Sequence, residues 1–465
     1  MSIEDQLYFL LKYYKKLPDS LRNGLIYPIR IIPRSFFQGK NYKKFVTLAH
    51  KFEFASRKSI EIFQTQKIIE LVNFAYNNIK FYKDFCNLHD INVKDIQNLN
   101  DFHKNIPLID KGIVQEKLEL FIAPEYNKTQ YLYANTGGST GTPLKLLYLK
   151  GYTRTAERAF WDVIFRRVNY KQGIRVARLR GDFIGKNRIY SFDPYRNTLM
   201  LNTFLINEKN AGEYLRLMNK FKIEYLHAYP AALYNLIQNS KQNSIKIKSL
   251  KYILLNSENI LDWQISLFES FFDTKNIFYG YGLGEMVAIA ASCEHSRYYH
   301  FHPAYSYVEF HSSKIKDNSN INDIIGTSFL NPLMPLIRYR TGDLCELNDA
   351  ECSCNRNHKI ASRIIGRSQD VAIGKNNERI TLTALIFGRH AEYFNHIKKM
   401  QIINTEPGKL IVIIVPKISF NTTYANEIIN SLSAKEGMPF EAELDIVQEI
   451  ELTERGKHKF FKRLF

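Results

Sequence analysis

Residues 134–143 read ANTGGSTGTP, a loop rich in glycine and hydroxyl side chains that follows the aromatic stretch TQYLY at 129–133. Glycines let consecutive backbone N–H groups approach a phosphate, and hydroxyls add further donors. The sequence therefore predicts a phosphate-wrapping loop formed by Thr136, Gly137, Gly138, Ser139, Thr140, Gly141 and Thr142. However, Thr142-Pro143 stands where a Walker-type loop has Lys-Ser/Thr. The cation that such a loop needs must come from elsewhere in the chain.

Short apolar runs alternate with helical patterns downstream of this loop. The runs are RVARL (175–179), IEYLHAY (223–229), KYILLN (251–256) and NIFYGYG (276–282). Strands that alternate with helices are typical of βαβ units, so we predict an α/β fold with mostly parallel sheets. Upstream, residues 59–86 place apolar side chains at helical spacing and predict one long amphipathic helix.

The chain divides into a large N-terminal domain, 1–368, and a small C-terminal domain, 369–465. Within the first, residues from about 290 to 366 are rich in strand patterns and predict a β subdomain. The second predicts an α+β domain, with a helix at 382–396, strands KMQIINT and KLIVIIVP, a helix near 424–437, and a strand at 441–450.

Charge is unevenly spread along the chain. The formal net charge is +18, and residues 1–60 alone hold 12 Lys/Arg against 4 Asp/Glu, interleaved with aromatics. Such a surface attracts anions. Two interpretations stay open: a helical segment with a solvated basic face, or peripheral contact with an anionic membrane surface. No RNP, zinc-finger or homeodomain pattern occurs, so we expect no nucleic-acid partner.

The N-terminus has acids before its apolar stretch and no small-residue cleavage site, and apolar runs such as LIVIIVP are too short to cross a bilayer. The sequence thus predicts a cytoplasmic protein, peripheral to the inner face of the membrane if the basic segment binds there. Five cysteines in 465 residues do not form a disulfide framework.

Five further motifs follow the glycine-rich loop in a fixed order. They are NSEN (256–259), YGYGLGE (279–285), RYRTGD (338–343), IIGRSQD (364–370) and ERGKHKF (454–460). With the loop, this ordered set resembles the adenylate-forming acid ligases, the superfamily of acyl-CoA synthetases, luciferases and peptide-synthetase adenylation domains. Within it, the chain looks most like the phenylacetate–CoA ligase branch, including relatives in capsular polysaccharide biosynthesis. The resemblance runs from about residue 60 to the C-terminus.

The resemblance implies a role for each motif. Thr136 to Thr142 would wrap the β- and γ-phosphates of ATP, with Ser139 and Thr140 as hydroxyl donors. Glu285 would bind Mg²⁺, and Asp343 would accept from both ribose hydroxyls. The remaining nucleotide-site residues would be Ser257 and Glu258 at the adenine, Tyr281 packed on its ring beside Gly282, and Arg367 near the ribose.

The resemblance also supplies the missing cation. Lys457 in RGKHKF resembles the superfamily lysine that reaches the α-phosphate and the attacking carboxylate, where negative charge accumulates in the transition state. Because Lys457 stands on the small domain, catalysis would depend on closure of a mobile domain. The hinge would be Gln369–Asp370. Members of the family often have Asp or Lys at the hinge position that Gln369 occupies here. Lys459, Lys462 and Arg463 are interpreted as a basic tail.

Cysteines and histidines predict a metal site. Cys293 and His300 in CEHSRYYH, followed by Cys352 and Cys354 in ECSC, supply three thiolates and one imidazole, a tetrahedral set suited to structural zinc. His295, His302 and Cys345 are rival ligands. The alternative is a set of free thiols with unrelated histidines.

Two departures bear on function. Gly284 replaces the Thr or Ser that usually precedes the metal-binding Glu, and VAIGKNNERITLTAL differs from the text that lines the CoA tunnel in phenylacetate ligases. The leading hypothesis is an ATP-dependent ligase that forms an acyl-adenylate and passes the acyl group to a thiol of CoA or a carrier protein. One alternative passes the acyl group to an amine or hydroxyl in surface polysaccharide assembly. Another is a non-catalytic nucleotide-binding relative. The identity of the carboxylic acid is not predicted.

Overall fold

The structure is a computed structural model. It describes residues 39–135, 144–180, 184, 188–240, 245–313, 320–347, 351–367, 371–375, 379–381, 393, 396–433, 440–451 and 459–465. The predicted phosphate loop (136–142), the hinge residues Gln369 and Asp370, and Lys457 lie outside this set. Arg367 is described by its backbone only.

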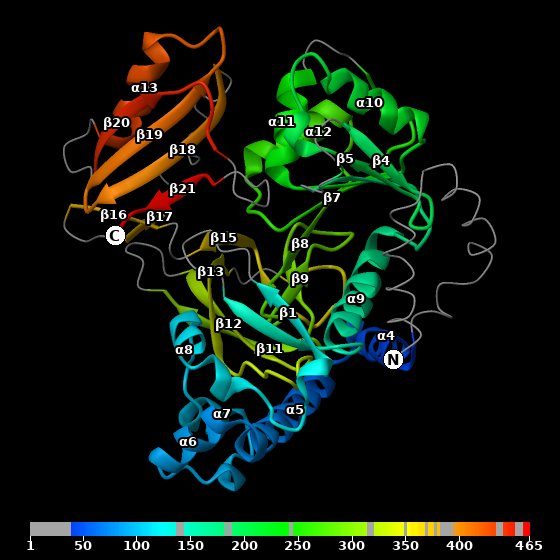
Figure 1. Cartoon of the computed structure of the whole chain (residues 1–465), viewed down its shortest axis with the longest axis vertical. Helices are drawn as coiled ribbons and strands as arrows, with labels where there is room; N and C mark the ends of the chain where they lie inside the picture. Colours follow the sequence, from blue (N-terminus) through cyan, green and yellow to red (C-terminus); the bar gives the residue numbers. More distant parts are fainter. Residues whose placement is uncertain are drawn as a thin grey trace.

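A mixed nine-stranded sheet forms the centre of the molecule (Figure 1), in the order β14-β10-β9-β8-β7-β6-β3-β5-β4. Its strands are β3 Val176–Leu179, β4 Tyr190–Asp193, β5 Thr198–Leu201, β6 Tyr225–Ala228, β7 Tyr252–Asn256, β8 Ile277–Gly282, β9 Ile289–Ala291, β10 Tyr299–Phe301 and β14 Lys359–Ala361. The central strands β5, β3, β6, β7 and β8 are parallel, whereas the pairings toward both edges are antiparallel. The four predicted strand runs and the α/β class are confirmed.

Helices cover both faces of the parallel strands. On one face lie α10 Ala211–Lys220, α11 Pro230–Ser240 and α12 Asp262–Phe272, and on the other lies α9 Thr153–Ile164 with the 3-10 turn η4 Phe165–Val168. On β7, Leu254 packs with α9 while its neighbours Ile253 and Leu255 pack with the other helices. Burial on both faces explains why these strands read as continuous apolar runs in the sequence.

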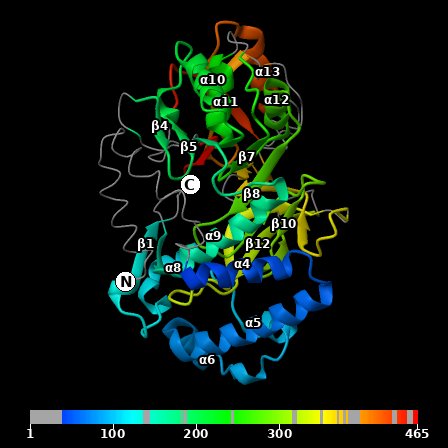
Figure 2. The same ribbon diagram turned by 90° about the vertical axis from the view of Figure 1, so that its right-hand side faces the viewer.

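A helical layer lies at the N-terminal side of the described chain, seen at the bottom of Figure 1 and from the side in Figure 2. It contains α4 Gly39–Glu53, α5 Arg57–Asn78, α6 Lys80–Leu88, η1 Val93–Asp95, α7 Leu99–Asn105, α8 Lys111–Glu116, η2 Leu118–Phe121 and η3 Lys128–Gln130. The single helix predicted over 59–86 is wrong, because the chain breaks at Ile79. That residue has an extended backbone and a buried side chain. The break lets Tyr82 and Cys86 of α6 turn into the core.

A second sheet, with strands in the order β11-β12-β13-β15, stands beside the central sheet. Its strands are β11 Ser306–Ser312, β12 Ile321–Ser328, β13 Tyr339–Glu346 and β15 Arg363–Arg367, all paired antiparallel. Strands β9, β10 and β14 fall within the predicted β subdomain range but pair with the central sheet. A separate hairpin, β1 Tyr131–Asn135 with β2 Lys145–Leu149, flanks the predicted phosphate loop.

The C-terminal part forms its own small α+β unit (Figure 1, upper left). A four-stranded sheet, β20-β19-β18-β21, is built from β18 Ile397–Glu406, β19 Lys409–Pro416, β20 Glu441–Ile446 and β21 Phe461–Arg463, with α13 Thr422–Ser433 packed on it. The short pair β16 Val371–Ile373 and β17 Arg379–Thr381 precedes it. The helix predicted over 382–396 lies almost entirely outside the described residues.

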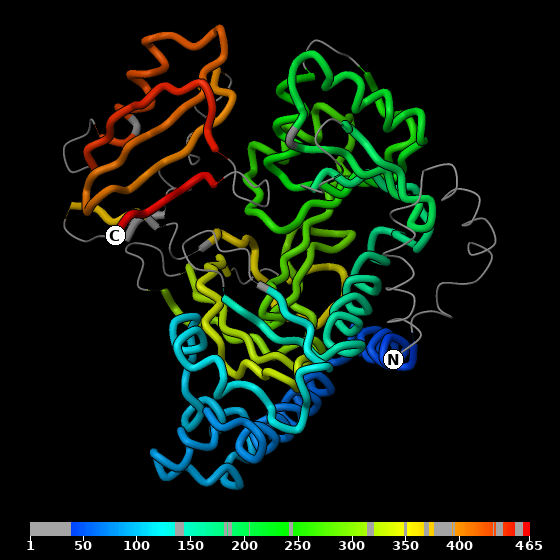
Figure 3. The backbone as a smooth tube through the Cα atoms, viewed as in Figure 1, coloured from blue at the N-terminus to red at the C-terminus, as the bar shows by residue number. Residues whose placement is uncertain are grey.

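One residue joins the two ends of this unit, whose chain course is traced in Figure 3. The Asn404 side chain accepts from the backbone N–H of Ile373 at 2.7 Å, and its carbonyl accepts from the N–H of Leu464 at 3.1 Å. The unit also touches the large domain, where Tyr234 on α11 donates to the carbonyl of Ile397 and Lys398 pairs with Glu208. Within the described ranges, no helix is long and apolar enough to span a membrane.

Candidate functional site

The carboxyl ends of the parallel strands bring the predicted nucleotide residues to one edge. Strands β3, β6, β7 and β8 end at Leu179, Ala228, Asn256 and Gly282. Ser257 and Glu258 directly follow β7, Tyr281 and Gly282 end β8, and Glu285 comes three residues later. In open α/β sheets, ligands bind outside the carboxyl ends of the strands. This edge is therefore the candidate active site.

Tyr281 and Asp343 join the two sheets at this edge. The Tyr281 hydroxyl donates to Oδ2 of Asp343 at 2.8 Å, and the two residues are 9% and 6% exposed. Asp343 lies on β13 directly opposite Arg367 on β15. A buried carboxylate is costly unless it is hydrogen-bonded. The tyrosine thus helps to hold an acceptor at the position where the ribose is expected.

Glu285 is held in a buried turn after β8. It is 6% exposed, and the Tyr339 hydroxyl donates to its Oε1 at 3.3 Å. The Tyr148 hydroxyl donates to the carbonyl of Gly284, and burial raises the pKa of Tyr148, so this phenol stays a donor. Met286 has a left-handed backbone, φ 58°, which turns the chain sharply behind Glu285. These contacts fix the carboxylate that is expected to bind Mg²⁺.

Trp161 on α9 crosses the end of β8 at close range. A Cβ at Gly280 would lie 2.7 Å from its ring, and one at Gly282 would lie 3.1 Å from it. Packing against Trp161 therefore favours glycine at Gly280 strongly, and at Gly282 it leaves a side chain little room. Gly282 is predicted to belong to the nucleotide site, whereas no sequence pattern indicates a role for Trp161.

Ser257 and Glu258 have structural partners at the same edge. Ser257 has a left-handed backbone, φ 67°, and its Oγ accepts from Nη2 of Arg180 at 3.0 Å. Glu258 Oε2 accepts from the backbone N–H of Ala231 at 2.9 Å, in the first turn of α11. An acid at a helix N-terminus complements the helix dipole. Glu258 therefore orients α11, a contact that the motif alone does not predict.

Arg180 is a cation of this edge that sequence reasoning missed. It follows β3, stacks on Tyr229 with 5.1 Å to the ring centroid, and places Nη1 3.3 Å from Nε2 of His227. Burial lowers the pKa of His227 well below its usual value, and Arg180 and Arg178 lower it further, so the imidazole is neutral. A signal was available in the text RLRGD, since a basic residue directly after a buried parallel strand points to the ligand edge.

The Cys/His cluster predicted from the sequence is assembled. Ligand atoms of Cys293, His300, Cys352 and Cys354 lie within 4.8 Å of one another and could hold a metal ion. The Cys293 and Cys352 sulfurs are 3.5 Å apart, and Cys354 Sγ lies 3.8 Å from Nε2 of His300. Burial alone would raise the pKa of the Cys293 thiol, but hydrogen bonds with His300, Ser296 and the His295 N–H lower it. The thiolate that a metal needs is thus favoured.

The rival ligands belong elsewhere. Cys345 is fully buried within the core of the central sheet, and burial raises its pKa to about 12. His295 approaches Cys293 through its backbone N–H, 3.3 Å from Sγ. His302 forms a second cluster with Glu53 and His358.

That second cluster anchors α4 to the body of the protein. Glu53 at the end of α4 accepts from Nε of both Arg167 and Arg356, at 2.7 Å each. His302 Nε2 lies 3.1 Å from the carbonyl of Ala49 and His358 Nε2 lies 3.1 Å from that of Phe52. Two guanidinium groups already neutralise the single carboxylate, so this site is unsuited to a cation. Arg356 also pairs with Glu294, which connects the anchor to the Cys/His cluster.

Comparisons with known proteins agree with this geometry. Residues 373–463 match the CapK C-terminal domain. The chain is 24% identical to protein CapK of Staphylococcus aureus over 411 residues, covering 85% of this chain and 88% of CapK. It is 22% identical to phenylacetate–coenzyme A ligase of Thermus thermophilus over 343 residues, covering 70% and 74%.

The fold is shared with a solved ligase. The structure of 2-hydroxyisobutyryl-CoA ligase in the postadenylation state with R3-HIB-AMP superposes with a TM-score of 0.68 at 14% identity, covering 89% of this chain and 91% of that one. The order of motifs, the relatives over most of the chain and the shared fold support one assignment. The chain belongs to the adenylate-forming ligase superfamily.

Proposed function

We propose that this protein activates a carboxylic acid with ATP and transfers the acyl group to a thiol of CoA or of a carrier protein. In the first step, a carboxylate oxygen of the acid attacks the α-phosphorus of ATP. The bond to the pyrophosphate oxygen breaks, giving an acyl-adenylate and pyrophosphate. In the second, the thiol sulfur attacks the acyl carbon and AMP leaves. The observation that carries the proposal is the buried Tyr281–Asp343 contact beside Glu285 at the carboxyl edge of the sheet.

The roles proposed for the described residues follow from their chemistry. Asp343 presents a carboxylate that can accept from two adjacent ribose hydroxyls, and Tyr281 offers an aromatic face for the adenine. Ser257, Glu258 and Gly282 lie around them. Glu285 would hold Mg²⁺, which would offset the charge of the triphosphate. Arg367, opposite Asp343 in the sheet register, is proposed to lie near the ribose.

Two parts of the proposal fall outside the described residues. Thr136 to Thr142 are proposed to wrap the phosphates, and the hairpin β1–β2 that flanks them ends beside this edge, since Tyr148 of β2 contacts Gly284. Lys457 is proposed as the catalytic cation on a mobile C-terminal domain, with Gln369 and Asp370 as the hinge.

Zinc is the metal that we assign to the Cys/His cluster. A tetrahedral zinc site with Zn–S bonds of about 2.3 Å has S···S edges of about 3.8 Å, close to the 3.5 Å between Cys293 and Cys352. Four protein ligands leave no open position, so the role would be structural. The ion would pin the 351–358 segment to the β9–β10 region.

A second acceptor class is favoured by one observation. The match to the CapK C-terminal domain covers the part of the chain that we propose as the mobile C-terminal domain. Acyl transfer from the adenylate to an amine or hydroxyl in surface polysaccharide assembly, without CoA, is therefore our alternative. In either case we propose that the protein works on the cytoplasmic side of the membrane.

A pyrophosphate exchange screen tests the proposal. Purified protein is given ATP, Mg²⁺ and labelled pyrophosphate with aryl, fatty and amino acids in turn. Acid-dependent formation of labelled ATP is expected for at least one class, and Asp343→Asn should reduce it strongly at limiting ATP. Repeating the productive reaction with CoA, carrier protein or amino sugars then separates the acceptors. ATP binding without exchange for any acid would instead favour a non-catalytic relative.

A further inference from the structure

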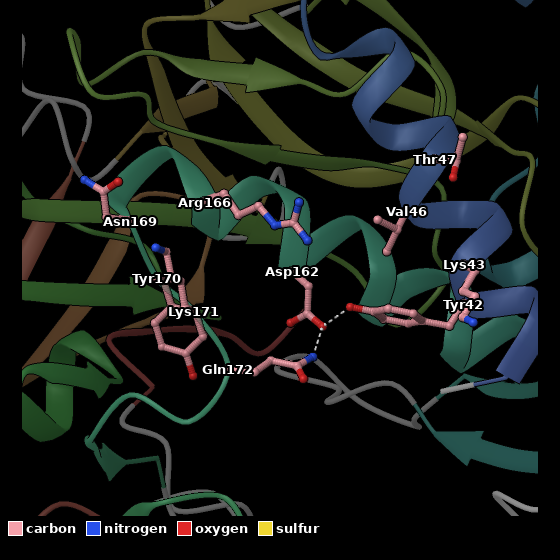
Figure 4. A pocket seen from close by; sticks show the side chains of 10 residues that line it. All are labelled: Tyr42, Lys43, Val46, Thr47, Asp162, Arg166, Asn169, Tyr170, Lys171 and Gln172. Atoms are coloured by element: carbon pink, nitrogen blue, oxygen red, sulfur yellow. Dashed lines mark hydrogen bonds between the residues drawn. The ribbon is translucent and has the colours of Figure 1, made fainter. Parts of the chain in front are cut away.

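A pocket of about 850 Å³ lies between α4 and the end of α9 (Figure 4). Tyr42 and Lys43 of α4 form one side, and Asp162, Arg166, Tyr170 and Lys171 line the rest. Lys171 lies in the loop that enters β3 at its amino end, whereas the candidate active site lies at the carboxyl ends of the strands. The pocket is therefore separate from the adenylation site.

The single carboxylate of the pocket is held by internal contacts. Oδ2 of Asp162 accepts from the Tyr42 hydroxyl at 2.7 Å and from Nε2 of Gln172 at 3.0 Å, as the dashed lines in Figure 4 show. Arg158 lies 3.8 Å from the same oxygen. Burial raises the pKa of Tyr42, and the charge of Asp162 raises it further, so the phenol stays protonated and donates. These contacts stiffen the floor between the two helices.

Three cations surround this floor. Lys43, Arg166 and Lys171 come from three different segments, and against the one carboxylate they leave the lining with a net charge of +2. Arg166 contacts Nε2 of His50, whose pKa is lowered by burial and by Arg166 itself, so this partner is neutral. Among the residues that the structure describes, none of the three cations has a carboxylate within ion-pair distance. The pocket thus holds positive charge that an anion would neutralise.

Phosphate is the anion that this lining suits. A guanidinium offers paired N–H donors to phosphate oxygens, and lysines add mobile point charges. The volume is within the usual range for small-ligand sites, about 300–1,000 Å³, and exceeds what one phosphate ion needs. Tyr42, Val46 and Tyr170 supply apolar surface beside the charges. An amphipathic ligand with a phosphate group and a short organic stem matches both features.

The neighbouring chain has the same character. Residues 1–38, which lead into α4 at Gly39, contain six Lys/Arg against three Asp/Glu, together with seven Phe or Tyr residues. On α4 itself, Lys40, Lys43 and Lys44 are exposed. Basic and aromatic side chains in one segment are typical of chains that bind the interface of an anionic bilayer. We propose that the pocket binds the phosphate headgroup of an anionic phospholipid and docks the protein on a membrane surface.

Vesicle co-sedimentation with the full chain tests this proposal. Phosphatidylcholine vesicles with and without phosphatidylglycerol are compared for wild-type protein, for Arg166→Gln/Lys171→Gln, and for Lys209→Gln/Lys220→Gln. The last pair removes the same charge from Lys209, just before α10, and from Lys220, its last residue, neither of which lines the pocket. Each basic residue near an anionic surface contributes about fivefold, so the pocket variant should lose at least about tenfold in partitioning. The α10 variant should stay near wild type, and both should unfold at the wild-type temperature.

Other outcomes would overturn the proposal. Equal loss in both double variants would mean that net charge alone drives binding, and no loss in the pocket variant would mean that residues 1–38 suffice. Glycerol phosphate, compared with chloride at equal ionic strength, separates the sources of phosphate. If wild-type protein binds it through Arg166 and Lys171 but ignores vesicles, the pocket serves a free phosphate ester. If the pocket variant loses binding to nucleic acid but not to vesicles, the occupant of the pocket is a nucleic acid and not a lipid.

Discussion

The Tyr281 hydroxyl and the Asp343 carboxylate meet at 2.8 Å although the two residues are 62 positions apart in the chain and belong to different sheets. Tyr281 ends β8 of the central sheet, and Asp343 lies in β13 of the second sheet. One hydrogen bond thus joins the residue proposed to carry the adenine to the residue proposed to carry the ribose. Both side chains are buried, and this bond fixes their positions relative to one another.

Asp343→Asn should weaken ATP binding by about tenfold to 100-fold. The substitution removes the charge from an acceptor, and hydrogen bonds to charged groups are worth about 1.5–3 kcal/mol. Calorimetric titration with ATP and Mg²⁺ measures the change. Tyr281→Phe, which keeps the ring and loses one neutral donor, should cost less than Asp343→Asn. Wild-type affinity in Asp343→Asn would remove the ribose assignment.

Local sequence patterns predicted the elements of this edge better than its contacts. The four parallel strands end where their apolar runs end, because burial on both faces demands those runs. The hydrogen bond from Tyr281 to Asp343 and the contact from Arg180 to Ser257 cross between elements, and no local spacing encodes them. Likewise, the break at Ile79 is invisible to helical periodicity, because α5 and α6 both bury their apolar faces in the same core.

The glycines show a second limit of prediction from local sequence patterns. YGYG and TGD are short patterns whose glycines can have several causes, and only the position of Trp161 shows that packing leaves little room for a side chain at Gly280 and Gly282. The Cys/His cluster was easier to predict than the contacts of these glycines. Cysteines and histidines grouped in this way have few explanations other than a shared site. Its rivals His302 and Cys345 could be separated from it only by their partners in the fold.

Lys457→Ala should abolish acid-dependent pyrophosphate exchange while ATP binding remains near wild type. An ammonium that meets the developing charge only after domain closure contributes to the transition state and little to the ground state. Lys462→Ala, which removes a nearby charge from β21, is the matched control and should keep its exchange activity. Near-normal exchange in Lys457→Ala would refute the role of this lysine.

Purified protein should contain about one equivalent of zinc, and Cys354→Ser should contain much less. Loss of one thiolate opens the four-ligand set, and the segment that includes Arg356 would then hold α4 less firmly. We expect the melting temperature to fall by roughly 5 °C, as a loss of a few kcal/mol would produce. Elemental analysis and thermal unfolding are the measurements, with Cys86→Ala, which removes a thiol outside the cluster, as the control for zinc content. Zinc far below one equivalent in the wild-type protein would count against the site.

Stability should decrease as the pH falls from about 6.5 toward 4. Burial lowers the pKa of His302 to about 4, an effect that Glu53 opposes and Arg167 reinforces. Since the unfolded imidazole titrates near 6.5, the unfolded state binds more protons in this window, and its free energy falls relative to that of the folded state. A shift of this size corresponds to about 3 kcal/mol. Urea unfolding at a series of pH values should show a shallower decline for His302→Gln, and an identical slope would contradict the assignment.

Arg180→Met should weaken ATP binding by roughly tenfold. The Arg180 guanidinium donates to Ser257 at 3.0 Å and holds this left-handed residue beside the proposed adenine site. A charged donor of this kind contributes about 1.5–3 kcal/mol when fully used, and solvent at this half-buried position reduces the effect. Arg175→Met, just before the amino end of β3, is the matched control and should bind ATP as the wild type does. If Arg180→Met binds ATP as well as Arg175→Met and the wild type do, Ser257 is held by the backbone alone and Arg180 has no part in the nucleotide site.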